Sequence, residues 1–321
     1  MSDTTPTPTP AAAAPPSAAT AKPAAKNNGN NKNNNNKKAA KPAPPPKREL
    51  KILMLHGYTQ SGPLFKGRTG ALNKLLNKAL GEPPYNYTVE MICPTGPYNL
   101  RPSDIPGYEP PEGASAEDGD EPTDNWGWFQ HDEGTGAYRR FDEGMQRVAD
   151  AIRDAGGVDG VLGFSQGGAF AQLAAAAMES ETRALPAHDP KTNNTEWAKV
   201  LRDANGNKPL KFCMVYSGFV ARDPALQWLY EGGMATPSLH VLGSLDTVVG
   251  EDRTRGLYEK CGPTEEGKGG KAQVLVHPGG HFVPVKKEWT TPVAGWLMQV
   301  LKSELPSAAE NGEGEKAKEA L

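Results

Sequence analysis

The chain has 321 residues, which allows one large domain or two small ones. Its 35 Lys and Arg residues against 38 Asp and Glu residues give a formal net charge of −3. This near-neutral balance argues against a nucleic-acid-binding protein, which usually carries a strong basic excess. No segment offers the roughly 18 consecutive apolar residues of a transmembrane helix, so no membrane span is predicted.

The cysteines are odd in number and widely spaced, at Cys93, Cys213 and Cys261. They form neither a disulfide framework nor a zinc-binding pattern. The N-terminus also lacks the apolar stretch of a secretory signal. We therefore expect the protein in the cytoplasm, with the nucleus as the alternative compartment.

Both ends of the chain are polar. Residues 1–48 consist almost entirely of Ala, Pro, Thr, Asn and Lys, and cannot bury enough apolar surface to offset the entropy of ordering. We predict a disordered tail there and a second one at 303–321, which leaves 49–302 as the folded domain. The lysines of the first tail fit either a solvated segment or a weak site for an anionic partner whose identity is unknown.

Between the tails, short apolar runs alternate with helical patterns. Phe141, Met145, Val148 and Ile152 have the spacing of one helix face, and a second face runs from Leu64 through Leu72 to Leu80. Such alternation predicts an α/β fold with a mostly parallel central sheet of about six strands flanked by helices. The predicted strands lie at 50–55, 88–93, 158–162, 210–216, 238–242 and 272–276.

Two polar stretches interrupt the alternation, at 101–124 and at 181–209. Long loops in a compact domain are usually functional or disordered. Because both stretches follow predicted sheet elements, we expect them to rim or cover an active site.

The segment from Gly163 to Gly167 contains G-x-S-x-G with Ser165 at its centre. This is the pattern of the α/β-hydrolase nucleophile elbow, a sharp turn between a strand and a helix. An apolar strand precedes the motif and an Ala-rich helix, 169–178, follows it, as the elbow requires. An ordinary glycine-rich turn is the alternative, but this context favours Ser165 as a nucleophile. Gly163 and Gly167 would then let the backbone pass close by.

An acid and a base follow the serine in the order that this fold uses. Asp246 comes just after the predicted strand 238–242, and His281 follows the last strand past two glycines. Asp252 and His277 are the rival acid and base. Because a serine hydroxyl is a weak nucleophile, it needs a base within hydrogen-bond reach, and an acid orients that base. We therefore predict a triad of Ser165, Asp246 and His281.

Stabilising an oxyanion requires hydrogen-bond donors aimed at the reacting carbonyl. The backbone N–H of Gln166, the residue after the nucleophile, is one candidate. The loop after the first strand supplies a second, and we predict that the donor is the Tyr58 N–H. His56 in the same loop is expected to brace it.

No cofactor or metal is expected. The segment 262–268 fits G-x-x-x-x-G-K, which is close to a phosphate-binding loop. However, Gly269 stands where Ser or Thr should follow, and the segment precedes a strand rather than following one.

Several blocks together resemble the FSH family of serine hydrolases, largely fungal proteins with a human relative linked to an ovarian-tumour-suppressor locus. The resemblance spans about residues 49–302. It implies an α/β-hydrolase that cleaves carboxylic esters of small acyl substrates with Ser165, Asp246 and His281. Some relatives resemble thioesterases that release polyketides. The matching blocks are Lys51–Gly62, Gly160–Gly168, Tyr216–Phe219, Pro237–Gly243 and His277–Pro284.

Besides an interaction protein that acts through its N-terminal tail, three functions remain open at this point. The first is an ester hydrolase that forms an acyl-enzyme, and the second is an acyl-thioesterase that releases a polyketide or fatty acyl chain from a carrier. A non-catalytic binding protein on the same fold is the third, since fold does not imply function. The Ser, Asp and His in the required order favour an enzyme.

Overall fold

The computed structural model describes residues 46–105, 107, 109, 124–132, 134–189, 194–262 and 272–305. The tails predicted at 1–48 and 303–321 lie largely outside these ranges, as do most of the 101–124 insert and of the segment 262–268 that resembles a phosphate-binding loop. Among the described residues, no helix is long and apolar enough to cross a membrane.

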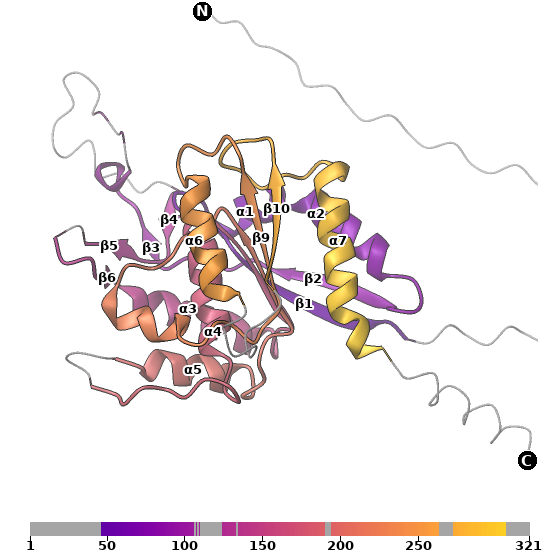
Figure 1. The fold of residues 1–321 in the computed structure, drawn as a ribbon, viewed down its shortest axis with the longest axis horizontal. Coiled ribbons are helices and arrows are strands. Elements are labelled where there is room, and N and C mark those ends of the chain that lie inside the picture. The colour runs from indigo at the N-terminus through magenta and orange to yellow at the C-terminus, as the bar shows by residue number, and fades with distance from the viewer. Residues whose placement is uncertain are drawn as a thin grey trace, which may run out of the picture. The chain divides into compact units, whose positions relative to one another are not determined.

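A six-stranded parallel sheet forms the centre of the described part of the chain (Figure 1). Its strands lie in the order β2-β1-β7-β8-β9-β10, and every neighbouring pair is parallel. Each strand begins and ends within two residues of a predicted run, so the predicted α/β fold is confirmed. The strands are β1 (Arg48–Leu55), β2 (Tyr87–Ile92), β7 (Gly160–Phe164), β8 (Phe212–Tyr216), β9 (Ser238–Gly243) and β10 (Ala272–His277).

Helices cover both faces of this sheet, and the alternation of side chains along each strand separates two apolar cores. From β1, Ile52 and Met54 enter one core, whereas Leu53 and Leu55 enter the other. The first core lies under α1 (Gly62–Arg68), α2 (Gly70–Leu80) and α7 (Lys287–Leu301). The second lies under α3 (Phe141–Asp154), α4 (Gln166–Ala177), α5 (Glu196–Ala204) and α6 (Glu251–Cys261).

Several short elements complete the described part of the chain. Two small antiparallel pairs join β3 to β4 and β5 to β6. The elements are β3 (Tyr98–Asn99), β4 (Trp126–Gly127), β5 (Gln130–His131), β6 (Tyr138–Arg139), and the 3₁₀ turns η1 (Pro102–Asp104), η2 (Pro224–Tyr230) and η3 (Lys302–Glu304).

The helix face predicted from Leu64 to Leu80 is wrong at its first residue. Thr69 leaves the helical conformation, with φ −96° and ψ 5°, so α1 ends and α2 begins there as separate helices. Consequently Phe65 is buried and Leu64 is exposed. The face predicted on α3 is buried throughout.

The 181–209 stretch is not a loop along its whole length, because it contains α5. Trp197 and Leu201 of this helix are buried in the core, and the Trp197 ring meets the ring of Phe141 edge-on at 5.1 Å. The short apolar face of α5 did not stand out in the sequence, because polar residues flank it on both sides.

Candidate active site

Ser165 lies on the sharp turn between β7 and α4, with φ 55° and ψ −119°. A non-glycine residue rarely adopts a positive φ, so this backbone is held by its surroundings. A Cβ on Gly163 would collide with the Gly167 carbonyl, and one on Gly167 would collide with the carbonyls of Leu55 and His56. Both glycines of the motif are therefore required by close backbone packing.

The structure brings Ser165, His281 and Asp246 together, although they come from three different loops. Ser165 Oγ lies 2.8 Å from His281 Nε2, and His281 Nδ1 lies 2.8 Å from Asp246 Oδ2. The Asp246 side chain is buried, whereas that of His281 is 18% exposed. The Ser165 hydroxyl is thus within hydrogen-bond distance of an imidazole whose other nitrogen contacts a carboxylate.

Four groups surround the Asp246 carboxylate. Besides His281, the backbone N–H groups of Val248 and Val249 each donate to Oδ1 at 2.9 Å, and the Ser217 hydroxyl donates as well. Burial alone would raise the pKa of Asp246, but the hydrogen bonds, led by that from His281, outweigh it and hold the pKa below its usual range. Asp246 is therefore ionised at neutral pH.

The loops after β9 and β10 are tied to each other, and this places the acid beside the imidazole. The Ser244 N–H donates to the His277 carbonyl at 2.9 Å, and the Leu245 N–H donates to the Gly279 carbonyl at 3.0 Å. The ring of Phe164, at the end of β7, packs against the imidazole of His281 with 4.8 Å between the ring centroids. The orientation of His281 is thus fixed by packing and by hydrogen bonds.

The two rival residues lie elsewhere. His277 is buried at the end of β10 beside the rings of Phe282 and Trp289, at 5.2 Å and 5.9 Å. Its pKa is lowered by burial, against a smaller opposing effect of Asp246. Asp252 is exposed in the first turn of α6, where a carboxylate suits the positive end of a helix dipole.

Tyr58 and Gln166, the predicted oxyanion donors, line one cavity together with Ser165. Within the described ranges, neither backbone N–H donates to a main-chain carbonyl. His56 braces this loop as expected. Its Nε2 accepts from the Gly96 N–H at 2.9 Å, so Nδ1 carries the proton that is donated to the Gly57 carbonyl at 2.8 Å. Burial lowers the His56 pKa to about 4 and keeps the ring neutral.

The side chain of Gln166 has a role that the sequence did not indicate. Its oxygen accepts from the Trp128 N–H at 2.8 Å, and its nitrogen donates to the Phe129 carbonyl at 2.9 Å. The Trp128 indole in turn donates to the His56 carbonyl at 2.9 Å. These bonds fasten the segment around β4 and β5 to the elbow and to the loop after β1.

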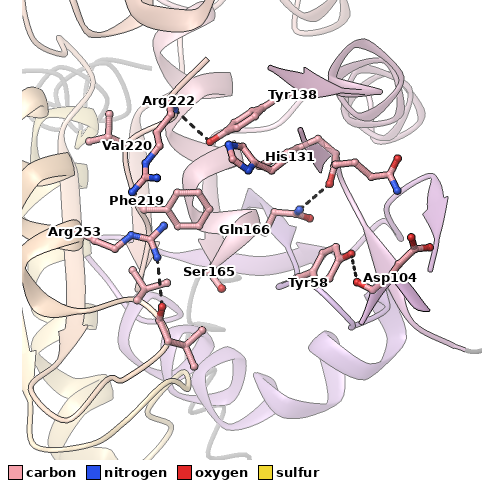
Figure 2. A pocket seen from close by; sticks show the side chains of 14 residues that line it. Tyr58, Asp104, His131, Tyr138, Ser165, Gln166, Phe219, Val220, Arg222 and Arg253 are labelled. Atoms are coloured by element: carbon pink, nitrogen blue, oxygen red, sulfur yellow. Dashed lines mark hydrogen bonds between the residues drawn. The ribbon is translucent and has the colours of Figure 1, made fainter. Parts of the chain in front are cut away.

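The cavity beside Ser165 has a volume of about 600 Å³ (Figure 2). Asp104 contributes to it from the 101–124 insert, as predicted for that stretch. No described residue of 181–209 lines it, so the expectation that this second stretch rims or covers the site stays untested. The lining residues are Tyr58, Asp104, Phe129, Gln130, His131, Tyr138, Ser165, Gln166, Phe219, Val220, Arg222, Val248, Val249 and Arg253.

The family model described as "Serine hydrolase (FSH1)" matches residues 46–293. The chain belongs to this family. "Family of serine hydrolases 3" of Saccharomyces cerevisiae is 30% identical over 260 residues, which cover 79% of this chain and 85% of that protein. "Esterase OVCA2" of Danio rerio is 32% identical over 250 residues, which cover 73% of this chain and 90% of that protein.

A longer relative is the "Dihydrofolate reductase" of Schizosaccharomyces pombe, 29% identical over 251 residues. The match covers 78% of this chain but only 47% of that protein, so the chain corresponds to about half the length of this relative.

Proposed function

We propose that this FSH1-family serine hydrolase cleaves carboxylic esters of small acyl substrates through a covalent acyl-enzyme. One observation carries the proposal: two consecutive hydrogen bonds of 2.8 Å join Ser165 Oγ to His281 Nε2 and His281 Nδ1 to Asp246 Oδ2. A serine becomes a nucleophile when it is hydrogen-bonded to a base that an acid orients in this way. A binding protein without catalysis would not need this arrangement.

In the first half of the reaction, His281 Nε2 takes the proton of Ser165 as Oγ attacks the ester carbonyl. The negative charge that develops on the carbonyl oxygen is met by the N–H groups of Tyr58 and Gln166. The intermediate then collapses, the C–O bond to the alcohol breaks, and His281 returns the proton to the leaving oxygen. The acyl group remains on Ser165.

Asp246 acts on this cycle through the imidazole. Its ionised carboxylate accepts the Nδ1–H of His281, which fixes the tautomer with a free Nε2 and stabilises the imidazolium while it carries the extra proton. In the second half, His281 activates a water molecule by the same proton transfer, and the water releases the acid from Ser165.

The same steps cleave a thioester, with a thiol in place of the alcohol. An acyl-thioesterase that acts on a carrier-bound polyketide or fatty acyl chain is therefore the alternative, and the substrate panel below separates the two. We propose that residues 49–302 form the catalytic unit and that it works in the cytoplasm. The free thiols of Cys93, Cys213 and Cys261 support that compartment.

The test is labelling of the purified protein with a fluorophosphonate, together with turnover of p-nitrophenyl esters and S-acyl thioesters of graded chain length. Ser165→Ala should lose the label and reduce turnover by about 10⁶-fold while it keeps its melting temperature. Ser303→Ala, at an exposed serine far along the chain, serves as the matched control and should behave as the wild type. Near-normal turnover of Ser165→Ala would refute the proposal.

A further inference from the structure

Two arginines line the cavity that contains Ser165. Arg222 follows β8 and Arg253 lies in the first turn of α6, so the chain brings them to the same wall from separate elements. Figure 2 shows both guanidinium groups on the side of the pocket occupied by Phe219. The proposed hydrolysis of a neutral ester uses neither of them.

Two residues that line the cavity, Phe219 and Val248, contact the Arg253 guanidinium. Its guanidinium carbon lies over the Phe219 ring, 4.8 Å from the centroid, and Nη1 donates a long hydrogen bond of 3.4 Å to the Val248 carbonyl. Stacking on an aromatic face leaves the edges of a guanidinium free to donate to a ligand. Phe219 and Val248 both line the cavity, so these free donors are at its surface.

Neither arginine forms an ion pair with a carboxylate in the part of the chain that the structure describes. Acidic groups near them have other partners. Asp223 accepts from the N–H groups of Tyr138 and Ala225, and Glu251 pairs with Arg255. The Asp223 carboxylate thus acts on this wall through its charge alone, and neither guanidinium donates to it directly in the described part of the chain.

The two charges also act on one common group. Burial raises the pKa of the Tyr138 hydroxyl, and the positive charges of Arg222 and Arg253 both work against that rise. Both guanidinium groups therefore lie within electrostatic range of the same hydroxyl in the cavity. Like charges gathered in this way repel each other, and an anion bound between them would relieve the repulsion.

We propose that Arg222 and Arg253 bind an anionic group of the substrate, a carboxylate or a phosphate that lies several bonds from the scissile carbonyl. Guanidinium groups match both oxyanions through paired N–H donors. Apolar lining from Phe129, Val220 and Val249 would hold the carbon chain between the two ends. The inference rests on the proposed function of Ser165 and names its substrate class, an anionic ester or thioester.

The experiment compares substrates that differ only in this charge. The acyl-side pair is p-nitrophenyl hydrogen adipate and p-nitrophenyl hexanoate, corrected for spontaneous hydrolysis. The leaving-group pair is S-hexanoyl pantetheine 4′-phosphate and S-hexanoyl pantetheine. Wild-type kcat/KM should be about tenfold or more higher for the anionic member of at least one pair, since hydrogen bonds to charged groups are the strong ones. This preference should shrink as salt is added.

Arg222→Gln and Arg253→Gln should each abolish most of this preference and leave kcat/KM for the neutral member within about twofold. Arg255→Gln is the matched control, because Arg255 is an exposed arginine of α6 that pairs with Glu251 and lies outside the cavity. A response in the adipate pair assigns the anion to the acyl chain, and one in the phosphate pair assigns it to the leaving group.

Two results would overturn the inference while the proposed function stands. One is equal kcat/KM for the anionic and neutral members of both pairs in the wild type. The other is an equal loss on both members in the glutamine variants, which would mean that the arginines only support the wall. If none of the four substrates is hydrolysed, the proposed function itself fails and this inference fails with it.

Discussion

The side-chain oxygen of Gln166 accepts a 2.8 Å hydrogen bond from the backbone N–H of Trp128, across 38 positions of sequence. Gln166 follows Ser165, the proposed nucleophile, and its backbone N–H is a proposed oxyanion donor beside the cavity. One residue therefore joins the elbow to the segment that carries Phe129 and Gln130, two residues of the cavity wall. A disturbance of that wall is expected to reach the elbow through this side chain.

Gln166→Ala should be destabilising, because it leaves the Trp128 N–H and the Phe129 carbonyl without their partner in a buried place. Each orphaned group costs about 1–3 kcal/mol. The backbone N–H of residue 166 remains, so kcat should fall far less than it does in Ser165→Ala. Urea unfolding and turnover measure the two effects, with Gln146→Ala on the exposed face of α3 as the control. An unchanged free energy of unfolding would contradict this account of Gln166.

Gly167→Ala should prevent the elbow from closing, since the added methyl group would meet the carbonyls of Leu55 and His56. These carbonyls belong to β1 and its following loop and cannot move without disturbing the sheet. We expect stability to fall by at least the roughly 1–3 kcal/mol that is typical of overpacking a rigid core, and fluorophosphonate labelling to be lost.

Gly295→Ala is the matched control for this substitution. Gly295 lies inside α7, where an added methyl group would have no neighbour within 4 Å, and alanine is favoured over glycine in a helix by about 1 kcal/mol. Its melting temperature should stay the same or rise. If Gly167→Ala behaves like Gly295→Ala, the elbow is not packed as described.

The sheet was predictable because buried parallel strands read as unbroken apolar runs, and all six lie within two residues of their predicted bounds. The errors in the predicted helices arose where the spacing of apolar residues did not reveal a helix or its end. The helix expected from Leu64 to Leu80 is broken at Thr69, whose backbone is not helical. The helix α5 was missed because its apolar face, with Trp197 and Leu201, is short and set within a polar stretch.

For the site, the order of Ser165, Asp246 and His281 was readable because each follows a strand, and parallel strands bring their carboxyl ends to one edge. The supporting contacts were not readable. The Ser217 hydroxyl on Asp246 and the Gln166 side chain on Trp128 depend on three-dimensional proximity alone. The same holds for the meeting of Arg222 and Arg253 in one cavity, because nothing in their spacing marks them as partners.

Stability should fall as the pH drops through the window from about 6.5 to about 4, because two buried histidines resist protonation. Burial lowers the pKa of both His56 and His240 from 6.5 to about 4. Between these values the unfolded chain binds more protons than the folded one, so the free energy of unfolding increases with pH. The contribution is fully present above about pH 6.5, and its loss is on the order of 3 kcal/mol per histidine.

His240→Phe tests this linkage directly. His240 Nδ1 has no hydrogen-bond partner among the described residues, and Nε2 has only Ser238 Oγ at 3.2 Å, so a phenyl ring replaces the imidazole at modest cost. The slope of unfolding free energy against pH should become shallower between pH 6.5 and 4. Tyr258→Phe, which changes the neighbouring ring but keeps the imidazole, should leave the slope as it is. An unaltered slope in His240→Phe would show that this histidine does not titrate as proposed.

The two histidines near the end of the sheet should respond in opposite ways to alanine. His281→Ala removes the group that lies 2.8 Å from Ser165 Oγ and is expected to be as damaging to turnover as Ser165→Ala. Its fold should persist, since the His281 side chain is partly exposed. Imidazole added to the buffer should restore part of the activity if the cavity admits it to the vacated position beside the serine.

His277→Ala should instead lower stability and largely spare the chemistry. The His277 ring is buried beside the rings of Phe282 and Trp289, so its removal leaves a cavity there and reduces the melting temperature. Turnover per folded molecule should stay within about tenfold of the wild type, because the hydrogen bonds that join Ser165 to Asp246 through His281 are kept. The decisive comparison is kcat and melting temperature for both variants side by side. If folded His277→Ala is inactive while His281→Ala turns over substrate, the base is His277 and the proposed triad is wrong in that member, although Ser165 could still be the nucleophile.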